Sequence, residues 1–195
     1  STQELRKAKR STQVWMLDVA SGRTRQLTFA EKSITSPQWS KDGKSILFLS
    51  AREGGNQLWT LDLAGGEARR LTSFEPGLGT PRMLPGNRVV FDAQVFLESM
   101  ADGARHRELQ EKLVKGPVQA HLADSLLYRH WTAYRDFQYT HLFRANLGDG
   151  KVEAITSGPQ DYPADATSGS PQTFDASPDG REVCVPTHPD PVPAR

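Results

Sequence analysis

The chain repeats one pattern of apolar and polar positions. Residues 13–28 (QVWMLDVASGRTRQLT) and residues 57–72 (QLWTLDLAGGEARRLT) align without gaps at an offset of 44 residues. In both copies an apolar run with Trp and Leu precedes a glycine-containing turn and a polar stretch that ends in Leu-Thr. This order predicts a β-hairpin. A period near 44 residues is typical of one four-stranded blade of a β-propeller.

The residues before the second copy complete the repeating unit. Residues 39–44 (WSKDGK) contain an Asp-Gly turn, and residues 45–50 (SILFLS) form an apolar run that predicts an inner strand. Residues 58–63 place apolar side chains on both faces of an extended chain, so we expect a strand that is buried between neighbouring blades. Gly65 and Gly66 supply the positive φ angles of the following tight turn.

The repeat continues toward the C-terminal end of the chain. Residues 141–156 (HLFRANLGDGKVEAIT) form a third copy, 84 residues after the second, and residues 177–181 (SPDGR) repeat the turn. The turn leads into Val183, Cys184 and Val185. As the single cysteine, Cys184 has no partner for an internal disulfide, and its apolar neighbours predict a buried structural thiol rather than a nucleophile.

The pattern breaks between residues 93 and 116. Apolar positions at Leu109, Leu113 and Val114 lie near helical spacing among Glu and Lys, which predicts a helical insertion. Insertions from strand ends tend to lie on one face of a propeller, where ligands and partner domains bind, although a solvated excursion without a role explains the pattern equally well. After it, residues 125–131 and 139–147 predict two strands.

The predicted fold class is therefore all-β: a partial β-propeller with four-stranded antiparallel blades and one helical insertion. Residues 1–195 are expected to form a single propeller fragment of about three to four blades, some of them partial. Because an open propeller leaves unpaired sheet edges, we expect the native protein to contain further chain.

Composition and motifs exclude several classes of function. Charged residues are 24% and the net charge is +1, with basic residues scattered among the turns, so no nucleic-acid partner is expected. No apolar run approaches membrane-spanning length, which argues against a membrane partner. The five histidines lack zinc-ligand spacing and no Gly-x-Ser-x-Gly motif occurs. We therefore expect no metal, no cofactor and no catalytic residue within this chain.

The residues resemble a known family. The run VWMLDVASGRTRQLT together with PQWSKDGKSILFLS resembles the propeller repeat shared by TolB and by serine peptidases of the prolyl oligopeptidase family. The helical insertion, then LLYRHW at residues 126–131, HLF at 141–143 and SPDG at 177–180, is similar in order to the N-terminal propeller of bacterial dipeptidyl-peptidases and acylaminoacyl-peptidases. The likeness covers roughly residues 13–187.

This resemblance implies a function divided between two domains. It implies a C-terminal α/β-hydrolase domain with a Ser, Asp and His triad, which lies outside these 195 residues. The propeller would cap the active site of its own hydrolase domain and gate short peptides of the acylaminoacyl or dipeptidyl type. The expected partners are thus that domain and a short peptide substrate. Oligomerisation and the compartment, cytoplasmic or periplasmic, stay open.

The sequence also offers candidate substrate-binding residues and a second class of function. Glu98 and Asp102 in the insertion are weak candidates for binding the α-ammonium group of a peptide, against the alternative of a solvated helix face. The alternative function is a non-catalytic TolB-like or WD-repeat scaffold for protein–protein interaction. A small-molecule site in the central channel ranks behind both, because the repeated residues point to packing.

Overall fold

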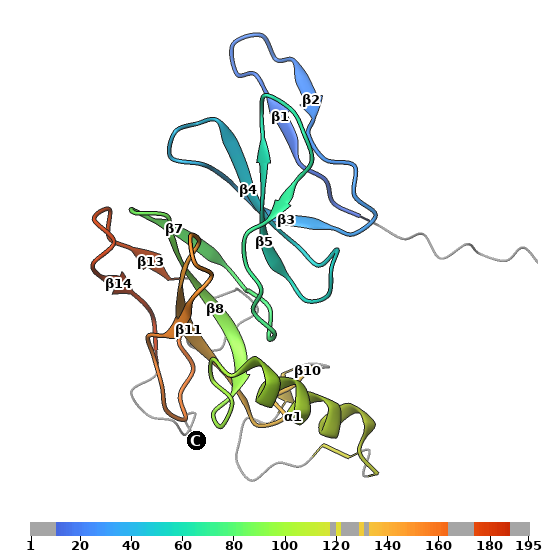
Figure 1. Cartoon of the computed structure of the whole chain (residues 1–195), viewed down its shortest axis with the longest axis vertical. Coiled ribbons are helices and arrows are strands. Elements are labelled where there is room, and N and C mark those ends of the chain that lie inside the picture. The colour runs from blue at the N-terminus through green and yellow to red at the C-terminus, as the bar shows by residue number, and fades with distance from the viewer. Residues whose placement is uncertain (1–10, 118–119, 122–128, 131–132, 164–173, 188–195) are drawn as a thin grey trace, which may run out of the picture. The chain divides into compact units, whose positions relative to one another are not determined.

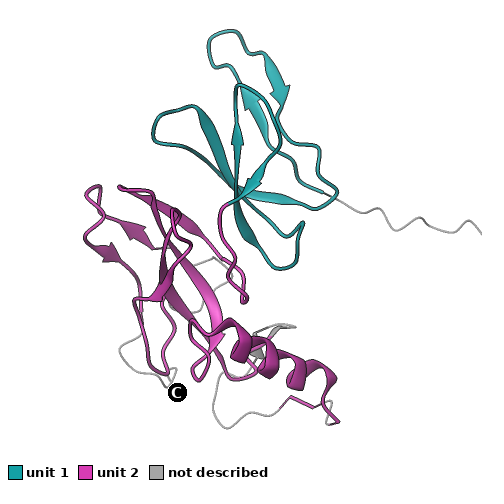
Figure 2. Cartoon of the chain, in the orientation of Figure 1, with its two compact units in different colours: residues 1–70 teal, residues 71–195 magenta. Residues whose placement is uncertain are grey.

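The structure, a computed structural model, describes residues 11–117, 120–121, 129–130, 133–163 and 174–187 (Figure 1). The chain divides into two compact units, Ser1–Arg70 and Leu71–Arg195 (Figure 2). Within the described residues, each unit contains one four-stranded antiparallel sheet; the first unit has one further two-stranded pair and the second unit has two.

The first unit contains the first copy of the repeat and the second copy up to Arg70. Its described strands are β1 (Trp15–Leu17), β2 (Thr24–Gln26), β3 (Ile34–Trp39), β4 (Ser45–Ser50), β5 (Gln57–Asp62) and β6 (Arg69–Arg70). Strands β3 to β6 pair in chain order into one sheet, whereas β1 and β2 form a separate hairpin. The turn between β5 and β6 uses positive φ angles of 127° at Gly65 and 103° at Gly66, as predicted. Apolar residues of β3, β4 and β5 form the core of this unit together with Val14.

A threonine ends the repeat in the same way in two copies. In the first copy, the backbone N–H of Val14 donates to Oγ1 of Thr28 at 2.9 Å. In the third copy, the N–H of Leu142 donates to Oγ1 of Thr156, also at 2.9 Å. The side chain thus satisfies a backbone donor of the neighbouring strand that would otherwise lack a partner. This bond gives a physical reason for the threonine at the end of these two copies.

The second unit has a four-stranded sheet in which a long insertion separates two neighbouring strands in the sequence; we call this insertion the excursion. Its described elements are β7 (Pro81–Leu84), β8 (Arg88–Phe96), α1 (Gly103–Lys115), β9 (Arg129–His130), β10 (Ala133–Tyr134), β11 (Gln138–Asn146), β12 (Val152–Ala154), β13 (Asp175–Ala176) and β14 (Val183–Cys184). The four-stranded sheet has the order β12-β11-β8-β7. Phe91 of β8 lies opposite Phe143 of β11 with ring centroids 5.8 Å apart, and Phe74 packs against both rings.

The excursion contains α1, β9 and β10, because β8 and β11 are neighbours in the sheet but distant in the sequence. Helix α1 lies within the stretch predicted as a helical insertion, although Ala93–Phe96 of that stretch continue strand β8. The strand predicted at residues 139–147 corresponds to β11. Of the strand predicted at 125–131, residues 129–130 form β9, and the others lie outside the described residues. The fold class is confirmed: antiparallel four-stranded sheets with one inserted helix.

The prediction for Cys184 was wrong, because its side chain is exposed. The hairpin of β13 and β14 alternates its side chains, with Val183 and Val185 packed against the core that contains Phe174. Successive residues of a strand point to opposite faces, so Cys184 points to the solvent.

Candidate functional site

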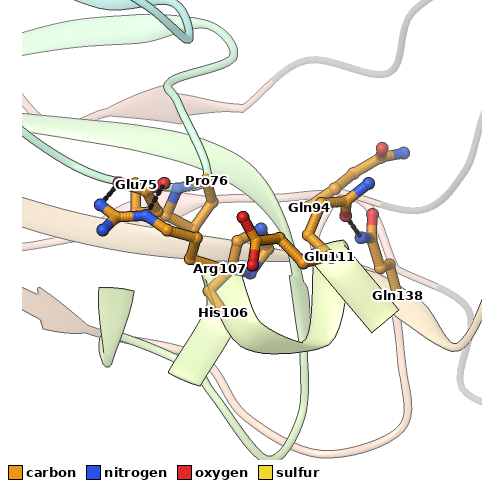
Figure 3. Close-up of a pocket in the computed structure, with 8 residues that line it drawn as sticks. Glu75, Pro76, Gln94, His106, Arg107, Glu111 and Gln138 are labelled. Atoms are coloured by element: carbon orange, nitrogen blue, oxygen red, sulfur yellow. Dashed lines mark hydrogen bonds and ion pairs between the residues drawn. The ribbon is translucent and has the colours of Figure 1, made fainter. Parts of the chain in front are cut away.

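A pocket lies between α1 and the sheet of the second unit (Figure 3). Its volume is about 330 Å³. Its walls come from the loop before β7, from β8, from β11 and from the first three turns of α1. The lining residues are Glu75, Pro76, Gln94, His106, Arg107, Gln110, Glu111 and Gln138. Most of these side chains are polar, so the pocket is suited to a ligand that forms hydrogen bonds.

Local interactions determine where α1 begins and how its outer face is paired. Oδ1 of Asp102 accepts the N–H of Arg105 at 3.0 Å, which caps the first turn. Further along, Nζ of Lys112 donates to Glu108 at 2.6 Å. Hydrogen bonds from Lys112 and from Arg105 lower the pKa of Glu108 to about 2. Such pairs, four or three residues apart, support an exposed helix.

The two residues proposed from the sequence lie near the start of α1 and not among the residues that line the pocket. Oε2 of Glu98 accepts from Nη2 of Arg105 at 2.5 Å, and Asp102 is the helix cap. Both carboxylates therefore already have partners within the insertion. Their binding of a peptide α-ammonium group stays a prediction.

The loop before β7 is fixed to the sheet by Asp92. Its carboxylate accepts the N–H of Thr80 at 2.5 Å, and its backbone carbonyl accepts the N–H of Gly79 at 2.7 Å. A β-carbon at Gly79 would overlap the Asp92 carboxylate, so the close approach requires glycine. Burial raises the pKa of Asp92. The loop then presents Glu75, which binds Arg107 of α1 through two hydrogen bonds of 2.8 and 2.6 Å.

His106 is the buried residue of the pocket lining, with 6% of its surface exposed. Its ring packs against Phe96 at a centroid distance of 5.3 Å, and its Nδ1 lies 3.4 Å from Oγ of Ser99. Burial lowers the pKa of His106, and the negative charge of Glu75 opposes this effect. The imidazole is therefore neutral at neutral pH.

Two glutamines connect α1 to the sheet on the other side of the pocket. Nε2 of Gln138 on β11 donates to Oε1 of Gln110 on α1 at 2.9 Å. The side chain of Gln94 on β8 is exposed beside them (Figure 3). Among the residues that the structure describes, the pocket lining contains no serine, threonine or cysteine, so these residues can bind a ligand but offer no hydroxyl or thiol nucleophile.

Sequence reasoning missed this site because its residues are far apart in the sequence. Glu75 and Arg107 are separated by 32 positions and Gln110 and Gln138 by 28. The available signal was His106, a residue of intermediate polarity on the inward face of an otherwise charged helix. In the described parts of the chain, no group of His, Cys, Asp and Glu is arranged to hold a metal ion. The helix there is too short and too polar to cross a bilayer.

Comparisons with known proteins place the chain beside peptidase and TolB propellers. No family model matches the sequence. Dipeptidyl-peptidase 5 from Porphyromonas gingivalis is 36% identical over 168 residues, which cover 84% of this chain and 23% of that protein. The chain thus spans about a quarter of this relative's length.

Two solved structures share the fold. One is assigned as TolB from Agrobacterium tumefaciens, with a TM-score of 0.53 and 23% identity over 91% of this chain and 51% of the other. The second is an acylaminoacyl peptidase in complex with Z-Gly-Gly-Phe-chloromethyl ketone, with a TM-score of 0.56 and 15% identity over 91% of this chain and 24% of the other. The chain is therefore a propeller fragment with partial homology to dipeptidyl-peptidase 5 and with the propeller fold of TolB and acylaminoacyl peptidase.

Proposed function

We propose that this chain is the propeller portion of a serine peptidase of the prolyl oligopeptidase family, and that it gates the access of short peptides to a separate α/β-hydrolase domain of the same protein. The 36% identity with dipeptidyl-peptidase 5 over 84% of the chain carries this proposal. The relative is far longer than this chain, so the activity of the whole protein, its substrates and its domain partner are all part of the proposal.

The chemistry of peptide hydrolysis would lie outside these residues. The sequence has no Gly-x-Ser-x-Gly motif, and the described residues of the pocket lining include no hydroxyl or thiol nucleophile. A propeller contributes instead by enclosing the reaction chamber, which limits the size of the substrate and reduces the water around the developing oxyanion. Antiparallel sheets with packed cores, such as β3 to β6, give the rigidity that such a cap requires.

The insertion is the part of this chain that we assign to the substrate side. It leaves the sheet between β8 and β11 and carries the described pocket on α1. Residues on excursions from a rigid scaffold often determine binding, because they vary without disturbing the core. Glu98 and Asp102 at the start of α1 stay candidates for the α-ammonium group of a peptide.

The test measures hydrolysis with and without the proposed catalytic domain. The 195-residue chain is incubated with a fluorophosphonate probe and with dipeptidyl and acylaminoacyl chromogenic substrates, and we expect neither labelling nor cleavage. The protein encoded by the whole gene should react with the probe and should cleave short peptides faster than long ones. Labelling of the 195-residue chain, or equal cleavage of folded proteins and short peptides by the whole protein, would contradict the proposal.

A non-catalytic scaffold is the second candidate, favoured by the structural likeness to TolB over 91% of this chain. The coding sequence beyond Arg195 separates the two candidates. A Gly-x-Ser-x-Gly motif between a strand and a helix supports the peptidase, whereas further blades followed by a stop codon support the scaffold.

A further inference from the structure

We propose that the pocket between α1 and the sheet of the second unit binds the uncharged main chain of a peptide, with Nε2 of His106 accepting an amide N–H of that peptide. The identity of the ligand as a peptide rests on the proposed function. The geometry of the pocket determines which part of the peptide it would bind.

The tautomer of His106 is assigned from its contact with Ser99. The hydroxyl of Ser99 has one proton, which it donates to the backbone carbonyl of Phe96 at 3.0 Å. Its oxygen is then left as an acceptor for the nearby Nδ1 of His106 at 3.4 Å. As part of the proposal, we assign the proton of the neutral ring to Nδ1, which makes Nε2 an acceptor. Among the described residues, nothing donates a hydrogen bond to this Nε2.

The charged groups of the pocket already have partners. Glu75 forms a two-bond ion pair with Arg107, and Glu111 pairs with Lys115 at 3.2 Å. A fully charged ligand would have to displace one of these partners. An uncharged polar ligand would leave both pairs in place, and so we expect a neutral group in the pocket.

The glutamines offer both kinds of hydrogen-bonding group. Since Gln138 donates to Oε1 of Gln110, the amide hydrogens of Gln110 and the Oε1 of Gln138 have no partner among the residues that the structure describes. Gln94 adds a third amide from β8. A peptide group carries one donor and one acceptor, which matches an acceptor at His106 and donors at the glutamines. The volume of about 330 Å³ is at the small end for a ligand site, so one or two residues of a peptide would be enclosed.

The probe is an uncharged peptide, N-acetyl-tetra-alanine amide, titrated into the 195-residue chain. Binding is followed by the ¹⁵N chemical shifts of the His106 ring and of the three glutamine side chains. We expect the Nε2 resonance to shift and Nδ1 to stay protonated. A set of depsipeptides, each with one amide replaced by an ester, removes one N–H donor at a time. We expect one member to bind about five- to tenfold more weakly, the value of one hydrogen bond.

Two variants test the residues that carry the proposal. His106→Phe keeps a ring against Phe96 and removes Nε2, so we expect a similar five- to tenfold loss of affinity. Ser99→Ala removes the group that holds the proton on Nδ1 and should weaken binding by a smaller factor. Glu108→Gln on the same helix lies outside the pocket lining and should bind as the unaltered chain does. Circular dichroism reports whether each variant folds, and the ring ¹⁵N shift in the unaltered chain tests the proposal without any variant.

Acidification provides an independent test. Glu75, Arg107 and Glu111 are the charged residues around this pocket, and the two carboxylates are held in ion pairs with Arg107 and Lys115. Protonation of His106 turns its Nε2 from an acceptor into a donor. Because burial lowers the pKa of His106, binding should persist through neutral pH and weaken only below the ordinary histidine range.

Several results would overturn the proposal. It fails if the uncharged peptide causes no shift at His106, if all depsipeptides bind as well as the parent peptide, or if only peptides with a free α-ammonium or a basic side chain bind. Binding is measured on the chain without hydrolysis. Failure here with a catalytically active whole protein would leave the proposed function standing, whereas binding here with an inactive whole protein would overturn the function alone.

Discussion

The hairpins β1–β2 and β5–β6 have nearly the same sequence but very different surroundings. Trp15 and Trp59 occupy the same position of the repeat, yet Trp15 is 59% exposed and Trp59 is 4% exposed. Strand β5 pairs with β4 on its other edge, whereas in the described residues β1 pairs with β2 alone. The repeated sequence thus specifies a hairpin, and the neighbouring strands decide whether its tryptophan belongs to a core.

The largest expected effect is on the two tryptophans. Trp59 packs in the core of the first unit, and its Nε1 donates to the carbonyl of Ser50 at 3.2 Å. We expect Trp59→Ala to lower the free energy of unfolding by about 3–5 kcal/mol. Trp15→Ala should change it by less than about 0.5 kcal/mol, because an exposed side chain leaves no cavity. Urea unfolding followed by circular dichroism measures both. Similar losses for the two variants would show that β1 is buried in solution by a contact outside the described structure.

This contrast also shows how far the sequence predicts the fold. The hairpins, the glycine turns and the inserted helix could be predicted, because each depends on residues close in the sequence. The exposure of Trp15 and of Cys184 could not be predicted, since it depends on which strands lie beside them. Apolar neighbours on both sides of Cys184 looked like a core strand, but in an alternating hairpin they are the residues that turn inward.

The candidate site was predictable only in part. The sequence left open whether the insertion at α1 binds a ligand or is a solvated excursion without a role; in the structure a pocket lies against that helix. It gave no sign that the loop with Glu75 would reach Arg107, because that loop is held in place by Asp92 of β8. Glu98 and Asp102 were weak candidates by charge, and Glu98 already pairs with Arg105.

A second test of the comparison concerns the threonine that ends each copy. Thr28 is buried and accepts the N–H of Val14. Thr28→Val would therefore leave this buried backbone N–H without its hydrogen-bond acceptor. We expect a loss of about 1–3 kcal/mol in the free energy of unfolding. Thr28→Ser keeps the hydroxyl and should recover most of it, and Thr24→Val on the exposed strand β2 is the matched control. If Thr28→Val unfolds at the same urea concentration as Thr24→Val, the repeated bond does not contribute to stability.

The turns should behave alike in the two hairpins, in contrast to the tryptophans. Gly22 has a φ angle of 68° and Gly66 one of 103°, and in both cases a β-carbon would meet open space. The penalty for Ala is therefore the backbone strain alone, about 1 kcal/mol at each position. We expect Gly22→Ala and Gly66→Ala to lower the urea midpoint by similar amounts, with Gly22→Asn less affected. A several-fold larger effect at Gly66 would mean that the buried hairpin also constrains its turn.

The smallest effect at neutral pH, and the most specific, concerns the third copy. His141 stands where the first two copies have Gln13 and Gln57, and its side chain is fully buried. Burial lowers the pKa of His141 in the folded state, against about 6.5 in an unfolded chain. Between these two values the unfolded chain binds more protons than the folded one, so stability falls as the pH drops below about 6.5 and is constant above it.

Replacing this histidine removes one source of that pH dependence. We expect His141→Gln to show a smaller loss of stability than the unaltered chain when the urea midpoint is compared at about pH 7 and about pH 5.5. His106, whose pKa burial also lowers, contributes in the same direction and stays in this variant, so the dependence should shrink rather than vanish. An identical pH dependence in both proteins would mean that His141 titrates equally in the folded and unfolded chains. In that case the third copy would tolerate a charge at the position where the other two copies have a neutral glutamine.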